Sequence, residues 1–195
     1  MARIGQIARK TGETEIQIKI NLDGSGEFLG TSGIPFFDHM LKLWAKHGSF
    51  DVELQAQGDL DVDGHHTVED IGIVLGQAFQ QALGTKENIY RYGQMILPMD
   101  ETLILAAVDI SGRPYLNFDI DIPLFKLGQF DTELVEEFMR AFCLNSGLTL
   151  HLKKFYGQNT HHLIEAIFKA LARALRQAVG VDPKGKGIPS TKGLL

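Results

Sequence analysis

The chain contains a single cysteine, Cys143, among its 195 residues. One cysteine cannot form a disulfide within the chain, so a disulfide-stabilised fold is excluded and a reducing compartment suits the protein. The neighbours of Cys143 are apolar and predicted to be helical. This setting favours a buried structural thiol over a nucleophile.

Long apolar runs are also missing from the sequence. No stretch reaches the roughly 18 apolar residues that a membrane span requires, and the first residues lack the apolar segment of a secretory signal. The net charge is −5, so no overall charge attracts the chain to nucleic acid or to anionic lipid. We therefore expect a cytoplasmic protein whose partners include neither nucleic acid nor a membrane.

Several common catalytic signatures are absent. The sequence has no P-loop and no G-x-S-x-G nucleophile motif. The glycine-rich stretch at 24–30, GSGEFLG, lacks the spacing of a dinucleotide-binding loop and is predicted to be a turn. The basic tail after Pro183 is typical of a solvated terminus, and binding of a local anion is the alternative.

The sequence is internally duplicated. The segment HHTVEDIGIVLGQAFQQALG at 65–84 aligns without a gap on HHLIEAIFKALARALRQAVG at 161–180. Both histidines, the glutamate four residues after the first histidine, and the final glycine are shared. Each segment predicts an amphipathic helix that a glycine terminates.

The segments that precede these two helices also correspond. In the first half, residue patterns predict a strand at 15–20, a turn at 21–26 into a second short strand, a helix at 35–47 and a strand at 50–56. In the second half, they predict strands at 102–110 and 115–120, a helix at 131–144 and a strand at 148–155. Asp131 is the predicted N-cap of that helix.

Each half is therefore predicted to be β-β-α-β-α, which gives an α+β fold with helices covering one face of the sheets. We expect one compact domain over residues 1–195, with half-repeats at 1–84 and 94–180, a join at 85–98 and a basic tail at 181–195. The halves are expected to pack sheet to sheet or to share one sheet.

The duplicated helices carry a pattern that favours metal binding. His65 and Glu69 are one helical turn apart and share a face, whereas His66 points about 100° away. The second half repeats this arrangement with His161, Glu165 and His162. Such a helix offers an imidazole and a carboxylate to one metal ion and a second imidazole to another, which suits Mn, Fe or Zn. Surface histidines at helix starts are the alternative, and two pairs in register with a glutamate each argue against it.

Other candidate residues lie outside these helices. His39 is predicted to begin the helix before the first histidine pair, where it would reach a metal ion near the start of that next helix. His47 and His151 are more typical of structural residues. Arg91 and Arg113 lie in turns and have the planar donor geometry that binds phosphate. A zinc hydrolase would need H-E-x-x-H, which the sequence lacks.

Five motifs together resemble the imidazoleglycerol-phosphate dehydratase family in order and spacing. They are GIPFFDHML at 33–41, DGHHTVED at 63–70, SGRPY at 111–115, NTHHLIEA at 159–166 and PSTKG at 189–193. The resemblance covers essentially the whole chain. It implies a fold similar to the second domain of ribosomal protein S5, duplicated, and a homo-oligomer that is an octahedral 24-mer with active sites between subunits.

The resemblance also implies two Mn²⁺ ions per active site and assigns residues to them. The implied metal ligands are His39, His65, His66, Glu69, His161, His162 and Glu165. The implied substrate contacts are Glu13, Arg91, Arg113, Ser190 and Lys192. Glu13 is implied as the acid/base carboxylate, and Glu69 and Glu165 would take part in catalysis as metal ligands.

The sequence departs from the family where many members have a histidine equivalent to His39 in the second half. Glu137 stands there, 24 residues before His161, as His39 stands 26 residues before His65. Since a carboxylate is an acceptable manganese ligand, we expect Glu137 to bind metal; a solvated helix residue is the alternative. Gly64 is a smaller departure, since an acid is common there.

The implied reaction removes water from imidazoleglycerol phosphate and yields imidazoleacetol phosphate, in histidine biosynthesis. The carbon that loses its proton has no neighbouring carbonyl, so a metal-bound imidazolate is expected to expel the hydroxyl. Two other function classes stay open: a metal-dependent hydrolase of a small phosphate ester, and a non-catalytic metal-binding or storage protein. The hydrolase would need water at the open metal position, and the storage protein would need no phosphate-binding arginines.

Overall fold

The computed structural model describes residues 2–195. Met1, the first residue of the predicted first half-repeat, lies outside them. The first half contains four strands and two helices: β1 (Ile4–Lys10), β2 (Thr14–Asn21), β3 (Phe28–Thr31), α1 (Pro35–Gly48), β4 (Asp51–Gly58) and α2 (His65–Leu83). These strands form one sheet in the order β1-β2-β4-β3, antiparallel except for the β3–β4 pair.

The second half repeats this plan. Its elements are β5 (Tyr92–Met99), β6 (Thr102–Asp109), β7 (Tyr115–Asp119), the short strands β8 (Lys126–Leu127) and β9 (Phe130–Asp131), α3 (Leu134–Ser146), β10 (Thr149–Tyr156) and α4 (Thr160–Val179). The second sheet has the order β5-β6-β10-β7, and β10 pairs in parallel with β7. The α+β fold of duplicated halves is thus confirmed.

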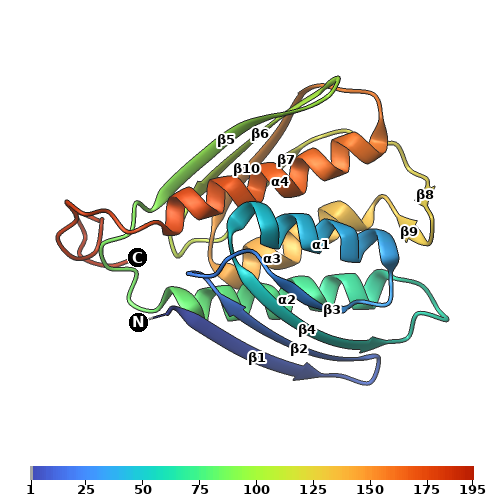
Figure 1. Ribbon diagram of the computed structural model, residues 1–195, viewed down its shortest axis with the longest axis horizontal. Coiled ribbons are helices and arrows are strands. Elements are labelled where there is room, and N and C mark those ends of the chain that lie inside the picture. The colour runs from blue at the N-terminus through green and yellow to red at the C-terminus, as the bar shows by residue number, and fades with distance from the viewer. Residues whose placement is uncertain (1) are drawn as a thin grey trace.

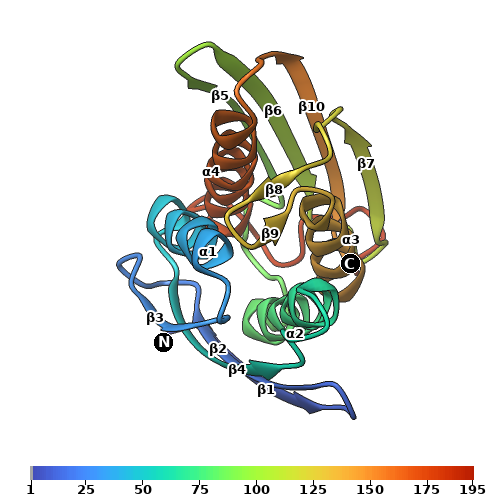
Figure 2. The same ribbon diagram turned by 90° about the vertical axis from the view of Figure 1, so that its right-hand side faces the viewer.

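The four helices form a layer between the two sheets (Figures 1 and 2). α2 packs on β1 and β2 of its own sheet, and α4 packs on β5 and β6. The halves meet through their helices, since α1 packs against α4 and α2 against α3. The prediction that the halves pack sheet to sheet or share a sheet is therefore wrong, because each sheet buries its apolar face under helices and leaves only helix surfaces for the contact.

Two edge strands, β1 and β5, were not predicted, and most of β5 lies in the predicted join. Gly5 and Gly93 occupy inward positions on these strands, and a Cβ on either would lie 1.9 Å from the carbonyl oxygen of Ala78 or Ala174 in the covering helix. Glycine allows this close approach of strand and helix. It also removes an apolar residue from the alternating pattern that would have predicted the strand.

Helix α3 begins at Leu134 rather than at residue 131. Asp131 belongs to β9 and forms an ion pair with Lys126, while the N-cap position holds Glu133 without a side-chain hydrogen bond. The prediction of Asp131 as N-cap is wrong because the β8–β9 hairpin, which no apolar pattern indicated, takes up that residue. α1, α2 and α4 match their predicted ranges within two residues.

Aromatic side chains fill the space where the helices of the two halves meet. Phe37 of α1 lies edge-on to Phe138 of α3, which stacks on Phe168 of α4 with ring centroids 5.3 Å apart. All three are buried. Truncating a buried phenylalanine to alanine costs about 3–5 kcal/mol, so these contacts fix how the helices of one half sit on the other.

Cys143 is fully buried in α3, as predicted. Its Sγ lies 3.1 Å from the carbonyl oxygen of Leu148, and burial raises the pKa of the thiol to about 11. The group is therefore a protonated structural thiol rather than a nucleophile. Among residues 2–195, no helix is both long and apolar enough to span a membrane.

Candidate metal centre and anion pocket

The start of α4 is fixed by its cap. The side-chain oxygen of Asn159 accepts hydrogen bonds from the backbone N–H groups of His161 and His162, at 3.0 and 3.2 Å. This N-cap satisfies two of the free donors of the first turn. In α2, the side chain of Asp63 accepts from the N–H of His65 at 2.7 Å. Both histidine pairs are thereby held in the first turn of a well-defined helix.

His39, His161 and Glu165 form a cluster. One ligand atom from each lies within 4.8 Å of the other two. Nε2 of His39 is 3.4 Å and Nε2 of His161 is 3.3 Å from Oε2 of Glu165. Two imidazole nitrogens and a carboxylate oxygen are donors that Mn, Fe and Zn share, and a thiolate that would select structural zinc is missing from this cluster. The donor set therefore fits a divalent transition metal.

The location of His39 corrects the sequence-based expectation. His39 was expected near the first histidine pair, at the start of α2, but it lies beside the second pair, at the start of α4. The reason is that α1 packs across the boundary between the halves onto α4. The cluster therefore combines one ligand from the first half with two from the second.

Lys169 extends this cluster by one helical turn. Its Nζ is hydrogen-bonded to Oε1 of Glu165, and both side chains are largely buried. Burial opposes ionisation of Glu165, but the Lys169 ammonium and His161 outweigh it, so the pKa of the carboxyl lies below its usual value. Glu165 is therefore a carboxylate at neutral pH, as metal ligation requires.

The second histidine of each pair has a carboxylate on Nδ1. Oδ2 of Asp59 lies 2.9 Å from Nδ1 of His66, and Oε2 of Glu101 lies 2.8 Å from Nδ1 of His162. These hydrogen bonds raise the pKa of both imidazoles. The contact with His162 also lowers the pKa of Glu101 to about 2. Nε2 of each ring is left free of such a bond.

The remaining predicted ligands lie apart from these contacts. Among the described residues, no side-chain hydrogen bond or ion pair joins His65, Glu69 or Glu137 to another group. Glu137 lies in the first turn of α3, and α3 packs on α2 as α1 packs on α4. The fold thus packs the helix of Glu137 on the helix of His65 and Glu69, but these three side chains do not form a metal-binding cluster within the described part of the chain.

Glu13 is the one predicted substrate contact that lies near a histidine. It precedes β2, and its Oε1 is 3.8 Å from Nε2 of His66. Its side chain is more than half exposed. The carboxylate makes no hydrogen bond to another side chain in residues 2–195, so it is available to a ligand.

The other four predicted substrate contacts line a single pocket of about 440 Å³. They are Arg91, Arg113, Ser190 and Lys192. Arg91 is held by two hydrogen bonds to Asp109, which raise its pKa, and by a bond of 2.9 Å to the carbonyl oxygen of Pro189. Arg113 is exposed, and its guanidinium makes one hydrogen bond within residues 2–195, to the carbonyl oxygen of Ser111 at 3.3 Å, so it has donors to spare. Guanidinium, ammonium and hydroxyl groups together suit an anion such as phosphate.

The metal cluster and the anion pocket lie at opposite ends of α4. The backbone N–H of Arg91 donates to the carbonyl oxygen of Ala178, near the end of the helix, whereas His161 is its second residue. At a rise of 1.5 Å per residue the two ends are roughly 25 Å apart. Figure 1 shows the C-terminal tail at the left of the molecule and the starts of α2 and α4 toward the right.

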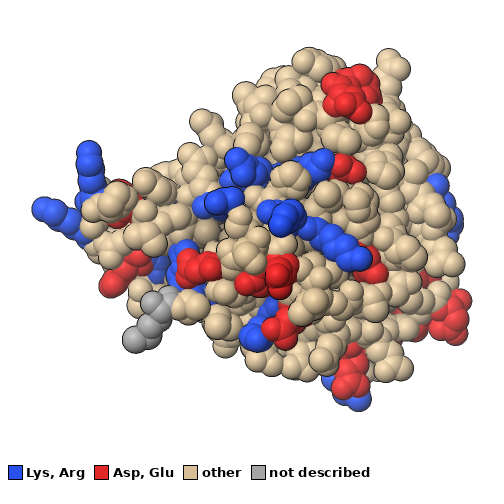
Figure 3. Space-filling model, viewed as in Figure 1, with Lys and Arg blue, Asp and Glu red and all other residues tan. Residues whose placement is uncertain are grey.

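Two other surface features are separate from these sites. Basic side chains gather in the middle of the face shown in Figure 3, which is the face where α1 and α4 lie in Figure 1. The exposed basic residues of these two helices include Lys42, Lys46, Arg173 and Arg176. His47 lies nearby, where burial and then the charges of Lys169 and Arg173 lower its pKa. The structural role expected of His47 stays a prediction.

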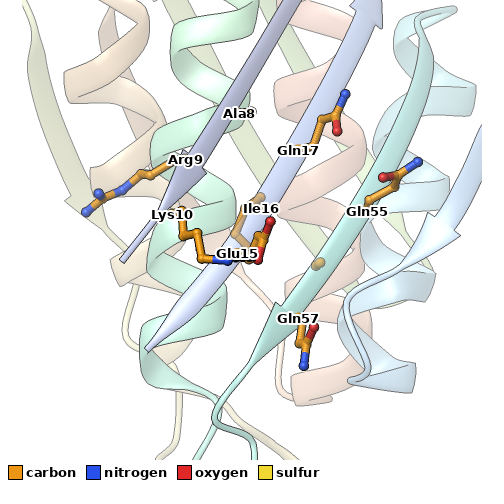
Figure 4. Close-up of a pocket in the computed structure, with 9 residues that line it drawn as sticks. Ala8, Arg9, Lys10, Glu15, Ile16, Gln17, Gln55 and Gln57 are labelled. Atoms are coloured by element: carbon orange, nitrogen blue, oxygen red, sulfur yellow. Dashed lines mark hydrogen bonds and ion pairs between the residues drawn. The ribbon is translucent and has the colours of Figure 1, made fainter. Parts of the chain in front are cut away.

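A hollow of about 400 Å³ lies on the outer face of the first sheet, away from the helices (Figure 4). Mostly polar residues of β1, β2 and β4 line it, and its only acid, Glu15, pairs with Lys10. It contains no histidine. The hollow is a solvated sheet surface, and the candidate chemistry lies at the helix ends.

Sequence reasoning missed three residues that contact candidate metal ligands. Lys169 stands one turn beyond Glu165, and extending the one-turn spacing along the helix would have found it. Glu101 precedes the first residue of β6 as Glu13 precedes the first residue of β2, so aligning the strands of the halves would have found it. Asp59 lies in the loop before α2 and carries no signal in the sequence.

Comparison with known proteins identifies the family of this chain. The family model described as imidazoleglycerol-phosphate dehydratase matches residues 32–175. The dehydratases of Acetivibrio thermocellus and Moorella thermoacetica are each 58% identical over 195 residues, which is 100% of this chain and of theirs. The solved structure from Staphylococcus aureus is 46% identical with a TM-score of 0.83, and the match covers 91% of this chain and 99% of that one. The structure from Pyrococcus furiosus is 37% identical with a TM-score of 0.83, covering 97% of this chain and 100% of that one.

Three findings lead to one conclusion: a family model matches most of the chain, relatives are 58% identical over its full length, and solved structures have the same fold. The chain belongs to the imidazoleglycerol-phosphate dehydratase family.

Proposed function

We propose that this protein is a lyase of histidine biosynthesis that dehydrates imidazoleglycerol phosphate to imidazoleacetol phosphate. One observation carries the proposal beyond family membership. The fold has histidine and carboxylate groups suited to a metal-bound imidazole at one end and a basic pocket suited to phosphate at the other. These are the two ends of that substrate. A reducing cytoplasmic location fits the single buried thiol.

We also propose that the active site binds two Mn²⁺ ions. The candidate ligands are His39, His65, His66, Glu69, Glu137, His161, His162 and Glu165. When bound, the ions supply positive charge that stabilises the deprotonated form of the substrate imidazole. The supporting observation is the donor chemistry of the cluster at His39, His161 and Glu165.

The protein's own residues would divide the remaining work. Glu13, with its uncommitted carboxylate beside His66, would take the proton from the carbon next to the one that loses its hydroxyl, and the resulting enol would tautomerise to the ketone. Arg113 and Lys192 would bind the phosphate, and Ser190 would donate a further hydrogen bond. Arg91 forms an ion pair with Asp109 that would hold its guanidinium in place in the pocket, where its positive charge would attract the phosphate. Holding both ends of the substrate fixes the reacting carbon relative to the base.

The geometry favours active sites shared between subunits. A three-carbon chain separates the imidazole from the phosphate in the substrate, which is far shorter than the roughly 25 Å between the ends of α4. One chain therefore cannot place its own cluster and its own anion pocket on one substrate molecule. We propose that the pocket of one chain faces the cluster of another in a homo-oligomer, with the octahedral 24-mer as the expected assembly.

Co-expression of two differently tagged variants tests this arrangement. His161→Ala removes the metal cluster and Arg113→Ala weakens the anion pocket, and each protein alone is expected to make little imidazoleacetol phosphate at a substrate concentration well below the KM of Arg113→Ala. Mixed particles purified through both tags should recover activity at up to roughly one quarter of the sites, because random mixing pairs an intact cluster with an intact pocket. Recovery supports the shared site.

The control pair is His39→Ala with His161→Ala. Both variants damage the same cluster within one chain, so no mixed particle contains an intact one and no activity should return. If the first pair also stays inactive, each chain makes its own site and the intersubunit proposal is wrong. If the wild-type protein with Mn²⁺ forms no imidazoleacetol phosphate, the proposed reaction itself is wrong.

A further inference from the structure

The two halves hold their second histidine with carboxylates from different places. In the first half the partner of His66 is Asp59, which follows β4, and in the second half the partner of His162 is Glu101, which precedes β6. The loop between β10 and α4, which corresponds to the loop of Asp59, contains Gly157, Gln158 and Asn159 and no acid. The two halves therefore make the same carboxylate–Nδ1 contact with residues from different loops.

The contact fixes which ring nitrogen is free. A carboxylate only accepts hydrogen bonds, so the bond to Nδ1 of His162 requires a proton on Nδ1. In the neutral ring, Nε2 then carries a lone pair and no proton, which is the form that binds a metal ion. The same reasoning applies to His66 and Asp59.

Glu101 is held far more firmly than Asp59. Its Oε1 accepts from the backbone N–H of Asn159 at 3.0 Å and from the hydroxyl of Thr102 at 3.1 Å, which leaves Oε2 for His162. In Asp59, Oδ2 contacts His66, whereas the buried Oδ1 has no partner among the described residues. These three hydrogen bonds together favour one orientation of the Glu101 side chain.

We propose that Glu101 and Asp59 are positioning residues that hold His162 and His66 with Nε2 presented to metal, and that Glu101 alone is locked in place by the cap of α4. The proposal rests on the proposed metal binding. It also gives the equivalent residues Glu101 and Glu13 different roles. Glu101 is bound to Nδ1 of His162, whereas its counterpart Glu13 faces Nε2 of His66 and stays free.

The two isosteric amide variants should behave differently. In Glu101→Gln, the N–H of Asn159 still requires an oxygen, so the new amide nitrogen is turned toward His162 and donates to Nδ1. This reverses the tautomer and places the proton on Nε2, where it blocks ligation. In Asp59→Asn no such requirement exists, because Oδ1 has no partner, and the amide can keep its oxygen on His66.

Titration of the metal-free proteins with Mn²⁺, followed by electron paramagnetic resonance, measures the effect. Glu101→Gln should weaken Mn²⁺ binding by roughly 10–100-fold at one site, the usual effect of losing an outer partner of a ligand. Asp59→Asn should weaken it by several-fold at most. Glu53→Gln, which removes an equal charge on the outer strand surface beside Lys19, should leave affinity unchanged. Equal losses for Glu101→Gln and Asp59→Asn would reduce the effect to charge alone and overturn the proposal.

A double-mutant cycle separates positioning from general destabilisation. If Glu101 acts through His162, then Glu101→Gln has no further effect on Mn²⁺ affinity in a His162→Ala background. If Glu101→Gln weakens Mn²⁺ binding just as much in the His162→Ala background, the proposal is contradicted. Thermal unfolding of each metal-free protein, measured in parallel, shows whether a variant has lost affinity because it folds poorly. Wild-type binding of Mn²⁺ tests the proposed function, and the differences among variants test the positioning.

Discussion

Nε2 of His39 lies 3.4 Å from Oε2 of Glu165, although the two residues belong to different halves of the duplicated chain. The contact exists because α1 of the first half packs on α4 of the second. Neither half can form this cluster alone. The packing that stabilises the fold is therefore the same packing that assembles the candidate metal centre.

His39→Ala should therefore weaken Mn²⁺ binding at the cluster without unfolding the chain, since the side chain is about half exposed. His47→Ala is the matched control on the same helix, because His47 has no place in the cluster. Metal content after dialysis against a limiting Mn²⁺ buffer measures both. Equal metal content in wild type and His39→Ala would remove His39 from the ligand set.

Metal removal should change the size of the particle as well as its activity. If the active site joins neighbouring chains, the free energy of metal binding also stabilises the assembly. Chelation should then abolish activity and shift the sedimentation profile to smaller species, and added Mn²⁺ should restore both. An unchanged profile after verified loss of metal would contradict assembly through the metal sites.

Glu13 and Arg113 should affect different kinetic constants. Glu13→Gln should lower kcat by roughly 10²-fold or more, the scale of general acid–base catalysis, while metal content stays normal. Arg113→Ala should mainly raise KM, because its partner is the phosphate, which does not react. Steady-state kinetics with metal analysis of each variant provides the measurement. Full kcat in Glu13→Gln would assign the proton transfer to another group.

Variants of Glu137 test whether the residue that departs from the family pattern binds metal. The α2–α3 packing brings Glu137 to the helix of His65 and Glu69, and its carboxylate has no other side-chain partner in residues 2–195. Glu137→Ala should therefore lose Mn²⁺ from one site, and Glu137→His should retain it because imidazole is also a manganese ligand.

His151→Ala is the control for that series. His151 lies in β10 beside Tyr115, with ring centroids 5.7 Å apart, and it should not affect metal content. Native mass spectrometry of the three variants counts the bound ions. Two tightly bound ions per active site in Glu137→Ala would leave Glu137 as a solvated helix residue.

Local sequence patterns predicted much of the fold. The 3.6-residue period and final glycines placed α2 and α4, and the alternation of Ile16, Ile18 and Ile20 placed β2, because each of these elements buries one regular face. The patterns did not predict β1 and β5, because Gly5 and Gly93 stand at the inward positions where an alternating pattern needs an apolar side chain.

For the candidate site too, the sequence predicted some features and missed others. The sequence by itself supplied the candidate ligands and their pairing within α2 and within α4, because residues one helical turn apart must share a face. It placed His39 at the wrong histidine pair, because neighbours along the chain are not the neighbours that helix packing selects.

Only the tertiary structure decided that His39 joins His161 and Glu165, that Glu101 holds His162, and that the anion pocket lies at the far end of α4. Each of these contacts joins segments far apart in the sequence. Their geometry depends on how buried aromatic side chains set one helix against another, and no local pattern encodes that packing.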